Sequence, residues 1–172
     1  MADLINLVDS SGRRIGSIEK LRAHQEGKLH EAFSIFVFNK GRELLLQKRN
    51  ENKYHSGGLW TNTCCSHAAL GEPLEEAIHR RLKEEMGFDC ELKELFPITY
   101  TAHFANGLTE NEFDHVFVGS SDAVPEPNPE EASDFKWMKT GDLIADANAH
   151  PEDYTEWLKV ILKNQSFLAY VL

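Results

Sequence analysis

Two glutamates lie in the segment LTENEFDHVFVG, which has the composition of a β-strand. Residues i and i+2 of a strand point to the same face, so Glu110 and Glu112 project together, about 6.5 Å apart. Adjacent carboxylates repel each other unless a cation or a shared proton makes the arrangement tolerable. A solvent-exposed polar face on an edge strand is the alternative. Because Val116 and Val118 continue the same face with apolar side chains, the pattern favours the cation or the shared proton.

Charged side chains also fall on the apolar face of a predicted helix that begins at Pro73 and ends before Gly87. At about 100° per residue, four side chains form one apolar stripe: Leu74, Ala77, Ile78 and Leu82. Arg81 and Glu85 fall within this stripe. An unpaired charge that faces a core is costly, so these two side chains must meet a metal ion, a phosphate, or each other. Their i, i+4 spacing leaves the mutual pair open.

Histidines and thiols supply further candidates. His24 and His30 are six residues apart, and this spacing alone does not distinguish metal ligands from surface or core histidines. The segment TNTCCSH contains two adjacent thiols, Cys64 and Cys65, just before His67. Neighbouring residues of an extended segment point to opposite faces, so only one thiol can reach a pocket. Cys65 shares a face with His67, which favours Cys65 as the reactive thiol and Cys64 as a small buried residue.

The predicted elements can gather these side chains around one sheet. Strands are expected where β-branched and aromatic residues cluster between turn residues, within residues 4–20, 32–49, 90–104, 108–119 and 135–139. Residues 32–49 form a hairpin around a turn at Asn39–Gly41. A second helix begins at Pro151, and Trp157 on its apolar face is by default a core residue. The polar segment 50–58 is a loop, and loops on a rigid sheet commonly carry function.

Composition narrows the class of protein. The chain of 172 residues contains 41% apolar and 27% charged residues and has a net charge of -10, and its length suits one domain, residues 1–172. No basic stripe is present, which argues against a nucleic-acid partner. We see no signal-peptide pattern and no run of ~18 apolar residues, so we expect a cytoplasmic protein without a membrane partner. The three cysteines form neither a disulfide framework nor a CxxC metal pair, as expected in a reducing compartment.

The predicted helix and the segment before it resemble a known signature. The stretch from Ser66 to Phe88 resembles the 23-residue Nudix box, with these positions in register: Glu72, Arg80, Leu82, Glu84, Glu85 and Gly87. Ser66 replaces the usual glycine, and Arg81 replaces a glutamate with which Nudix hydrolases bind catalytic metals. The segment TNTCCSH resembles the active-site segment of the type 1 isopentenyl diphosphate isomerase family, which has the Nudix fold. This resemblance covers nearly the whole chain and implies an α/β (α+β) fold with a mixed β-sheet sandwiched between helices.

The resemblance also implies a set of ligands. Five side chains would hold one divalent metal: His24, His30, His67, Glu110 and Glu112. Three imidazoles and two carboxylates suit Zn²⁺ or Mn²⁺ better than Ca²⁺, and Mg²⁺ stays open. Glu85 would bind a Mg²⁺ ion that also holds the substrate diphosphate. Four basic side chains would contact that diphosphate: Lys20, Arg49, Lys53 and Arg81.

The chemistry implied by the resemblance is the interconversion of isopentenyl and dimethylallyl diphosphate, in isoprenoid biosynthesis, through a tertiary carbocation. Glu112, helped by Tyr100, would donate the proton, and Cys65 would be the facing base. The ring of Trp157 would stabilise the cation. Two alternatives remain. A Nudix hydrolase of a nucleoside diphosphate derivative would need the glutamate that Arg81 replaces, and a non-catalytic binding module would have no use for these side chains. The sequence leaves monomer and homodimer open.

Overall fold

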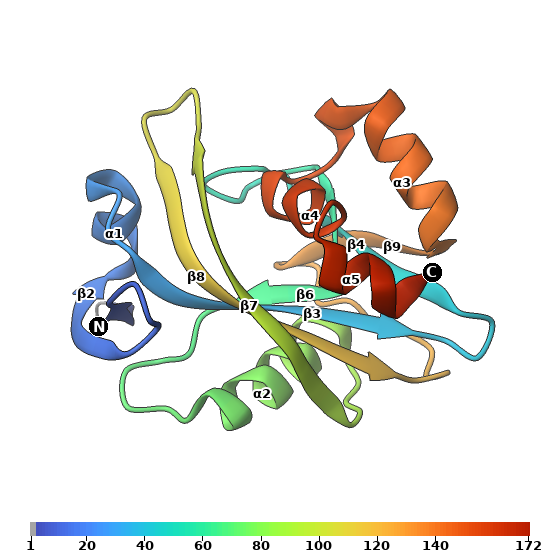
Figure 1. The fold of residues 1–172 in the computed structure, drawn as a ribbon, viewed down its shortest axis with the longest axis horizontal. Coiled ribbons are helices and arrows are strands. Elements are labelled where there is room, and N and C mark those ends of the chain that lie inside the picture. The colour runs from blue at the N-terminus through green and yellow to red at the C-terminus, as the bar shows by residue number, and fades with distance from the viewer. Residues whose placement is uncertain (1–2) are drawn as a thin grey trace.

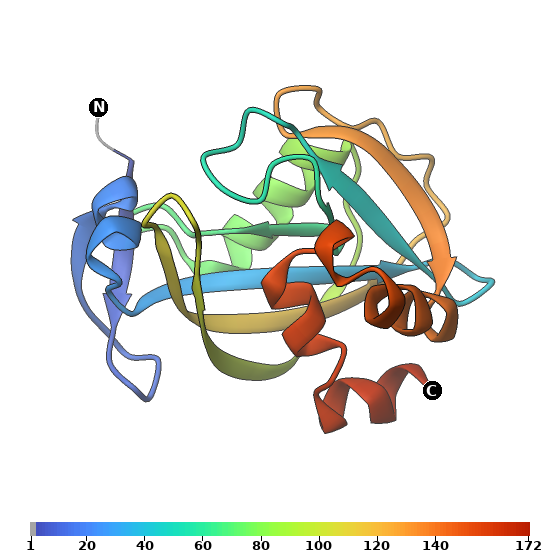
Figure 2. The same ribbon diagram turned by 90° about the horizontal axis from the view of Figure 1, so that it is seen from above.

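The computed structural model describes residues 3–172, which build one mixed β-sheet (Figures 1 and 2). Its central strand is β3 (His30–Phe38), whose side chains are nearly all buried. β3 runs parallel to β8 (Thr109–Ser120), and β8 pairs antiparallel with β7 (Leu92–His103). The parallel register sets His30 beside Glu112 near the start of both strands. Two of the predicted metal ligands therefore meet at one end of the sheet.

The predicted hairpin of β3 and β4 (Glu43–Arg49) opens soon after its turn. The two strands pair at Phe38 and Leu44, and farther along β3 the partner is β6 (Cys64–Ser66). The opening lets the TNTCCSH segment enter the sheet next to the central strand. The remaining strands lie toward the edges: β1 (Leu4–Val8), β2 (Arg14–Glu19), β5 (Trp60–Thr61) and β9 (Ala132–Lys139).

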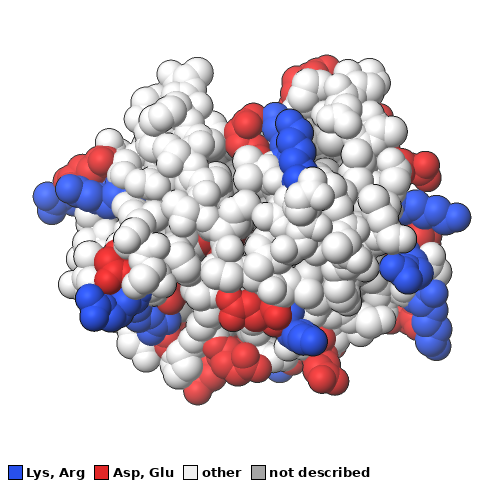
Figure 3. Space-filling model, in the orientation of Figure 1, with Lys and Arg blue, Asp and Glu red and all other residues white. Residues whose placement is uncertain are grey.

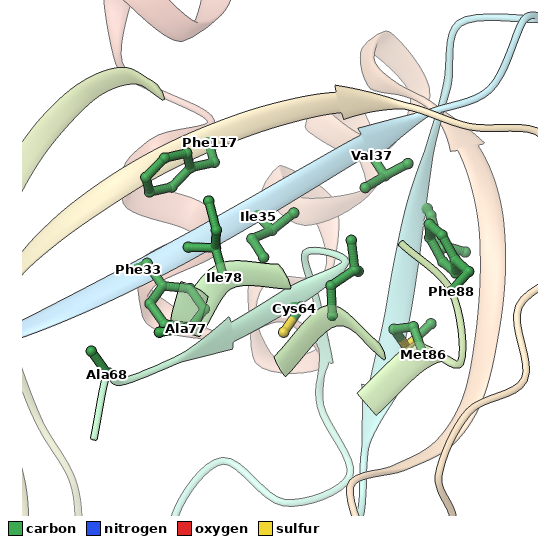
Figure 4. Packing of buried hydrophobic residues seen from close by; sticks show 12 residues of the cluster. Phe33, Ile35, Val37, Cys64, Ala68, Ala77, Ile78, Met86, Phe88 and Phe117 are labelled. Carbon is green, nitrogen blue, oxygen red and sulfur yellow. The ribbon is translucent and has the colours of Figure 1, made fainter. Parts of the chain in front are cut away.

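Helices cover both faces of the sheet. α2 (Leu74–Met86) packs on one face, where Cys64 lies among apolar side chains of the sheet and the helix (Figure 4). The other face carries the C-terminal helices: α3 (Thr140–Ala149), α4 (Glu156–Ile161) and α5 (Gln165–Val171) (Figure 2). Phe33 and Ile35 of β3 belong to the first core and Phe36 to the second, because successive side chains of a strand alternate. The predicted mixed sheet between helices is confirmed.

The C-terminal third differs from the prediction in its helices. The helix expected from Pro151 is only a 3₁₀ turn, η1 (Pro151–Asp153), followed by a break before α4. The break exists because Tyr154 is buried beside Trp60, whose carbonyl accepts a hydrogen bond from the backbone N–H of Thr155. α3 and α5 were not anticipated. Their apolar residues are buried because these helices pack on the sheet, and no local pattern in the sequence predicts that packing.

Charges of both signs are mixed over the face shown in Figure 3, without a continuous basic stripe. In the same view two raised lobes border a hollow, and comparison with Figure 1 places the β7–β8 turn in one lobe and the C-terminal helices in the other. Among residues 3–172, no helix combines the length and apolar composition needed to cross a bilayer.

Candidate metal centre and active-site pocket

Five side chains from four parts of the chain meet at the end of the sheet. Their potential ligand atoms all lie within 4.8 Å of one another. The set is the one expected from the sequence: His24, His30, His67, Glu110 and Glu112. α1 (Lys20–Glu26) supplies the first histidine, β3 and the residue after β6 supply the other two, and β8 supplies both carboxylates.

Backbone carbonyls orient two of the imidazoles. His24 Nδ1 lies 2.6 Å from the carbonyl of Lys20, and His30 Nδ1 lies 2.8 Å from that of Lys28. Since a carbonyl oxygen only accepts hydrogen bonds, each Nδ1 carries the hydrogen, and each Nε2 keeps a lone pair that can bind a metal. Both Nε2 atoms point into the cluster, which is the arrangement that metal-binding histidines adopt.

The potential ligand atoms of the cluster lie close to one another. His24 Nε2 lies 3.0 Å from Glu110 Oε1, and His67 Nε2 lies 3.1 Å from Glu112 Oε1. His30 Nε2 is 3.4 Å from Glu112 Oε1. This buried nitrogen and Glu110 Oε2 have no hydrogen-bond partner among the described residues. A buried set of nitrogen and carboxylate donors with orphaned lone pairs fits a divalent cation.

The electrostatics of the cluster also suit a cation. Burial and the neighbouring Glu112 carboxylate raise the pKa of Glu110 to about 8. Burial opposes ionisation of Glu112, but the imidazoles of His30 and His67 outweigh it and hold the Glu112 pKa well below its usual range. Burial lowers the pKa of His67 to about 3, and it opposes protonation of His24 too, although the Glu110 carboxylate raises the His24 pKa overall. A cation would neutralise both carboxylates and replace the proton of Glu110.

A pocket opens beside the cluster. Every predicted site residue except His24 and His30 lines it, and these two lie behind it in the cluster. Cys65 faces the pocket, whereas Cys64 is buried in the core beneath α2, as the alternation of side chains predicted (Figure 4). Burial raises the pKa of the Cys65 thiol to about 12. The Arg49 guanidinium lies close to this thiol, with Nη1 4.0 Å from Cys65 Sγ.

Tyr100 and Trp157 complete the walls of the pocket. The Tyr100 hydroxyl donates to Glu112 Oε2 over 2.6 Å, because β7 and β8 place these two residues opposite each other. Trp157 is buried, and its Nε1–H donates to Asn62 Oδ1 at 3.2 Å. The Arg49 guanidinium lies 5.1 Å from the centre of the Trp157 ring. Trp157 is thus both a packed residue and part of the pocket wall.

Three of the basic side chains that line the pocket are paired with carboxylates. Arg81 Nη2 donates to Glu85 Oε1 at 2.6 Å, so the mutual pair left open by the sequence is present, and it lies within the pocket. Arg81 also contacts Glu131 at 3.1 Å, and Lys53 pairs with the same carboxylate. Lys20 pairs with Asp3 at 3.8 Å. Together with Arg49, these cations line the pocket.

Comparison with known proteins identifies the family. A protein from Deinococcus radiodurans matches the fold with a TM-score of 0.78 at 21% identity, covering 93% of this chain and 97% of that one. A MutT protein from Methanosarcina mazei gives a TM-score of 0.65 at 17% identity, covering 83% and 92%. The model of the NUDIX domain matches residues 28–158. These likenesses establish the Nudix fold.

Sequence relatives are more specific. Isopentenyl-diphosphate Delta-isomerase 2 from Photorhabdus laumondii is 51% identical over 97% of this chain and 94% of its own length. Isopentenyl-diphosphate Delta-isomerase 2 from Aromatoleum aromaticum is 50% identical over 94% and 86%. The chain belongs to the isopentenyl-diphosphate Delta-isomerase family. The resemblance stated from the sequence is confirmed, and this member of the isomerase family is an enzyme.

Four pocket or near-pocket residues of this isomerase were not among the predicted site residues. Tyr54 and His55 come from the loop 50–58, where two aromatic rings in a polar segment were the available signal. Glu131 lies in the proline-rich loop, which offers no spacing signal. Asp114 continues the face of the paired carboxylates; it is buried, and the hydroxyl of Ser34 donates to it at 2.7 Å. Burial and the charge of Glu112 raise the pKa of Asp114 well above its usual range.

Proposed function

We propose that this chain interconverts isopentenyl diphosphate and dimethylallyl diphosphate. The observation that carries the proposal is the joint placement of a Tyr100-bonded carboxyl group, Glu112, and a buried thiol, Cys65, in one pocket beside a five-donor cluster. An unactivated alkene is a weak base. Its isomerisation needs an acid, a base and protection of the carbocation from water. The pocket offers a candidate for each requirement.

In the direction from isopentenyl diphosphate, Glu112 donates a proton to the terminal alkene carbon, and the π electrons form the new C–H bond. Cys65 then removes a proton two carbons away, and the electrons of that C–H bond form the new double bond. The reverse reaction exchanges the roles. Before substrate binds, the pKa of Cys65, raised to about 12, keeps the thiol protonated, and Glu112 is ionised. This protonation pattern suits the reverse direction directly, and the forward direction needs a proton on Glu112 and a thiolate at Cys65.

The five-residue cluster would hold one divalent cation, and its three imidazoles favour Zn²⁺ or Mn²⁺ over Mg²⁺. Bound there, the ion supplies Lewis acidity that makes a carboxyl proton on Glu112 easier to release. Glu85 would bind a Mg²⁺ ion together with the substrate diphosphate. Its two carboxylate oxygens accept from Arg81 and Gln47, which leaves one lone pair on each oxygen for a metal.

The diphosphate would be held by four basic side chains that line the pocket: Lys20, Arg49, Lys53 and Arg81. Its oxygens would compete with Glu131 for Lys53 and Arg81. Arg49 lies between Cys65 and Trp157, so its charge also stabilises a thiolate. The ring of Trp157 excludes water from the cation, and its face stabilises positive charge by about 2 kcal/mol when desolvated.

Every assigned residue comes from one chain, so the chemistry needs no partner subunit, and monomer and homodimer remain equally compatible with it. The three cysteines are free thiols. We place the protein in the cytoplasm, where thiols stay reduced.

The function is tested by incubating the metal-loaded protein with isopentenyl diphosphate in D₂O and following the alkene and methyl signals by NMR. We expect dimethylallyl diphosphate that carries deuterium, with no release of phosphate. A Nudix hydrolase would instead release phosphate from nucleoside diphosphate derivatives, because hydrolysis breaks a P–O bond. Phosphate release without movement of the double bond would replace this proposal with the hydrolase.

A further inference from the structure

His55 is a buried histidine of the pocket to which the proposed reaction gives no role. Its Nε2 lies 2.5 Å from Glu110 Oε1, the carboxylate oxygen that also faces His24. Neither His55 Nε2 nor the second oxygen of Glu110 has a hydrogen-bond partner among the described residues. The ring thus directs an unused polar atom at one of the five residues of the cluster.

Packing fixes the ring of His55. It stacks on Phe104, with ring centres 4.5 Å apart and planes 6° apart, and its edge meets Trp157 at 5.8 Å. Tyr54 closes a third side at 4.6 Å in an edge-to-face arrangement. Such contacts define the orientation of an imidazole more narrowly than its own rotamer preference does.

The backbone around His55 is held as firmly. The carbonyl of Tyr54 accepts from Asn106 Nδ2 at 2.8 Å, and the carbonyl of His55 accepts from Arg49 Nη2 at 3.2 Å. Ser56 has a φ of 53°, in the left-handed region that residues other than glycine rarely adopt. Unfavourable backbone of this kind persists where the surroundings require it, often at functional sites.

The neighbours of the ring assign its hydrogen. The Ser56 hydroxyl lies 3.1 Å from Nδ1 and can donate to it, which leaves Nε2 to carry the hydrogen. Once a metal has displaced the proton of Glu110, a lone pair on Nε2 would face a carboxylate oxygen at 2.5 Å and repel it, so the Nε2–H tautomer suits the loaded centre. In this structure Nε2 contacts Glu110 Oε1 without the alignment of a hydrogen bond.

We propose that His55 is a positioning residue of the metal centre, which holds the Glu110 carboxylate turned toward the other ligands. The inference rests on the metal site of the proposed function. His55 is not itself among the mutually close ligand atoms, so we assign it no bond to the ion. Carboxylates that bind metals are commonly held by a hydrogen bond from a neighbouring side chain, which the contact of His55 Nε2 with Glu110 Oε1 can supply when the ion is bound. Loss of such a partner costs roughly 10- to 100-fold in metal affinity or activity.

The test measures the Kd for Mn²⁺ on metal-stripped protein by calorimetry, for the parent and for His55→Phe and His55→Gln. Phe keeps the aromatic packing and loses the N–H, whereas Gln keeps an N–H donor. We expect His55→Phe to raise the Kd roughly 10- to 100-fold and His55→Gln to recover part of that loss. His103→Phe is the matched control, since His103 is an exposed histidine at the end of β7, next to Phe104, and the Kd of this variant should equal that of the parent.

Each result bears on the proposal. If His55→Phe binds Mn²⁺ with the same Kd as the parent, His55 is only part of the pocket wall and the inference is wrong. If the Co²⁺-loaded His55→Gln protein shows visible absorption bands that reveal a lost ligand, His55 binds the ion itself, which also overturns it. If His55→Phe fails to fold by circular dichroism, His55→Leu, which also lacks the N–H donor, carries the test, and a Kd equal to that of the parent refutes the proposal. Failure of the parent to bind Mn²⁺ would instead refute the metal centre of the proposed function.

Discussion

The Glu112 carboxylate joins two parts of the site. One oxygen, Oε1, lies 3.1 Å from His67 Nε2, and the other, Oε2, accepts the hydrogen bond of the Tyr100 hydroxyl. The proton affinity of this single group therefore responds both to the metal cluster and to the pocket wall. Tyr100 belongs to the pocket wall and not to the cluster, so it offers a way to perturb the carboxyl group without changing a metal ligand.

Replacing Tyr100 by Phe should slow turnover with little change in KM. The lost hydrogen bond is to a charged group and is worth about 1.5–3 kcal/mol, which corresponds to a rate loss of roughly 10- to 100-fold. Initial rates at saturating isopentenyl diphosphate measure it. Tyr170→Phe, at an exposed tyrosine of α5, should keep the parent rate. Equal rates for both variants would remove Tyr100 from the mechanism.

The adjacent thiols form a matched pair for a second prediction. Cys65→Ala should abolish isomerisation and leave the fold intact, because its side chain faces the pocket. Cys64→Ala should keep activity and lower the free energy of unfolding by about 1 kcal/mol, because it leaves a small cavity beneath α2. Turnover and urea denaturation separate the two. The opposite ranking would show that the roles of the two positions have been exchanged.

At the scale of residues, the sequence predicted which side chains meet in the cluster better than it predicted the residues around the cluster. Strand alternation placed Glu110 beside Glu112, and the family resemblance supplied the histidines. His55 could not be found in this way, because its approach to Glu110 depends on the path of a loop that spacing does not describe. Arg81 and Glu85, in contrast, could be found from the sequence. Both lie in an apolar stripe, so each had to meet an opposite charge, and in the structure they pair with each other.

At the scale of elements, the parallel pair of β3 and β8 positions the site. It sets His30 beside Glu112, and α1 then brings His24 against Glu110 from the side. α1 has only seven residues and ends at Gly27, which has a φ of 63°. A helix of this length is not stable alone in water. Its position therefore depends on contacts with the sheet, among them the cluster.

We predict that metal binding orders α1. Ligands from separate parts of the chain bind one ion only when the fold brings them together, so the ion should suppress opening of residues 20–28. Hydrogen exchange measured by mass spectrometry, with Mn²⁺ and with EDTA, should show slower exchange there in the presence of metal. α2, which packs in the apolar core, is the internal reference and should not change. The same exchange in α1 under both conditions would contradict the prediction.

The strands were easier to predict than the helices. Alternating or continuous apolar residues between turn signals located the long strands, and Pro73 and Gly87 marked α2. β5 and β6 contain two and three residues, which is too short for a periodic pattern. The break between η1 and α4 depends on the burial of Tyr154 against a distant strand, so its cause is tertiary.

At the scale of the whole molecule, the two cores on opposite faces of the sheet hold the ends of the strands as one rigid frame. The chain carries a net charge of -10, yet four basic side chains line its pocket: Lys20, Arg49, Lys53 and Arg81. Under the proposed function, an anionic substrate would be attracted to the pocket by these local charges and not by the overall field. Two carboxylates buried in the same frame make the stability of the metal-free protein depend on pH.

The last prediction concerns this dependence. In the metal-free protein the pKa of Glu110 is raised to about 8, above its value in the unfolded chain, so the stability contributed by its proton is full below the unfolded pKa and is lost as pH rises toward 8. A metal must displace that proton, and the displacement becomes easier as pH rises. The stabilisation by Mn²⁺ should therefore grow between about pH 6 and about pH 8.

Thermal midpoints with Mn²⁺ and with EDTA, at each pH, measure this stabilisation. At a metal concentration about 100 times the Kd, the gain is about 2.7 kcal/mol, or roughly 5–10 °C for a chain of this size. His67→Ala, which lacks a ligand, should show little gain at any pH. The pKa of His24 is also raised, so a metal must displace a proton from His24 too, and this also makes the stabilisation by Mn²⁺ grow as pH rises. A gain that is equal or smaller at the higher pH would mean that Glu110 does not release a proton when the metal binds, and would remove it from the ligand set.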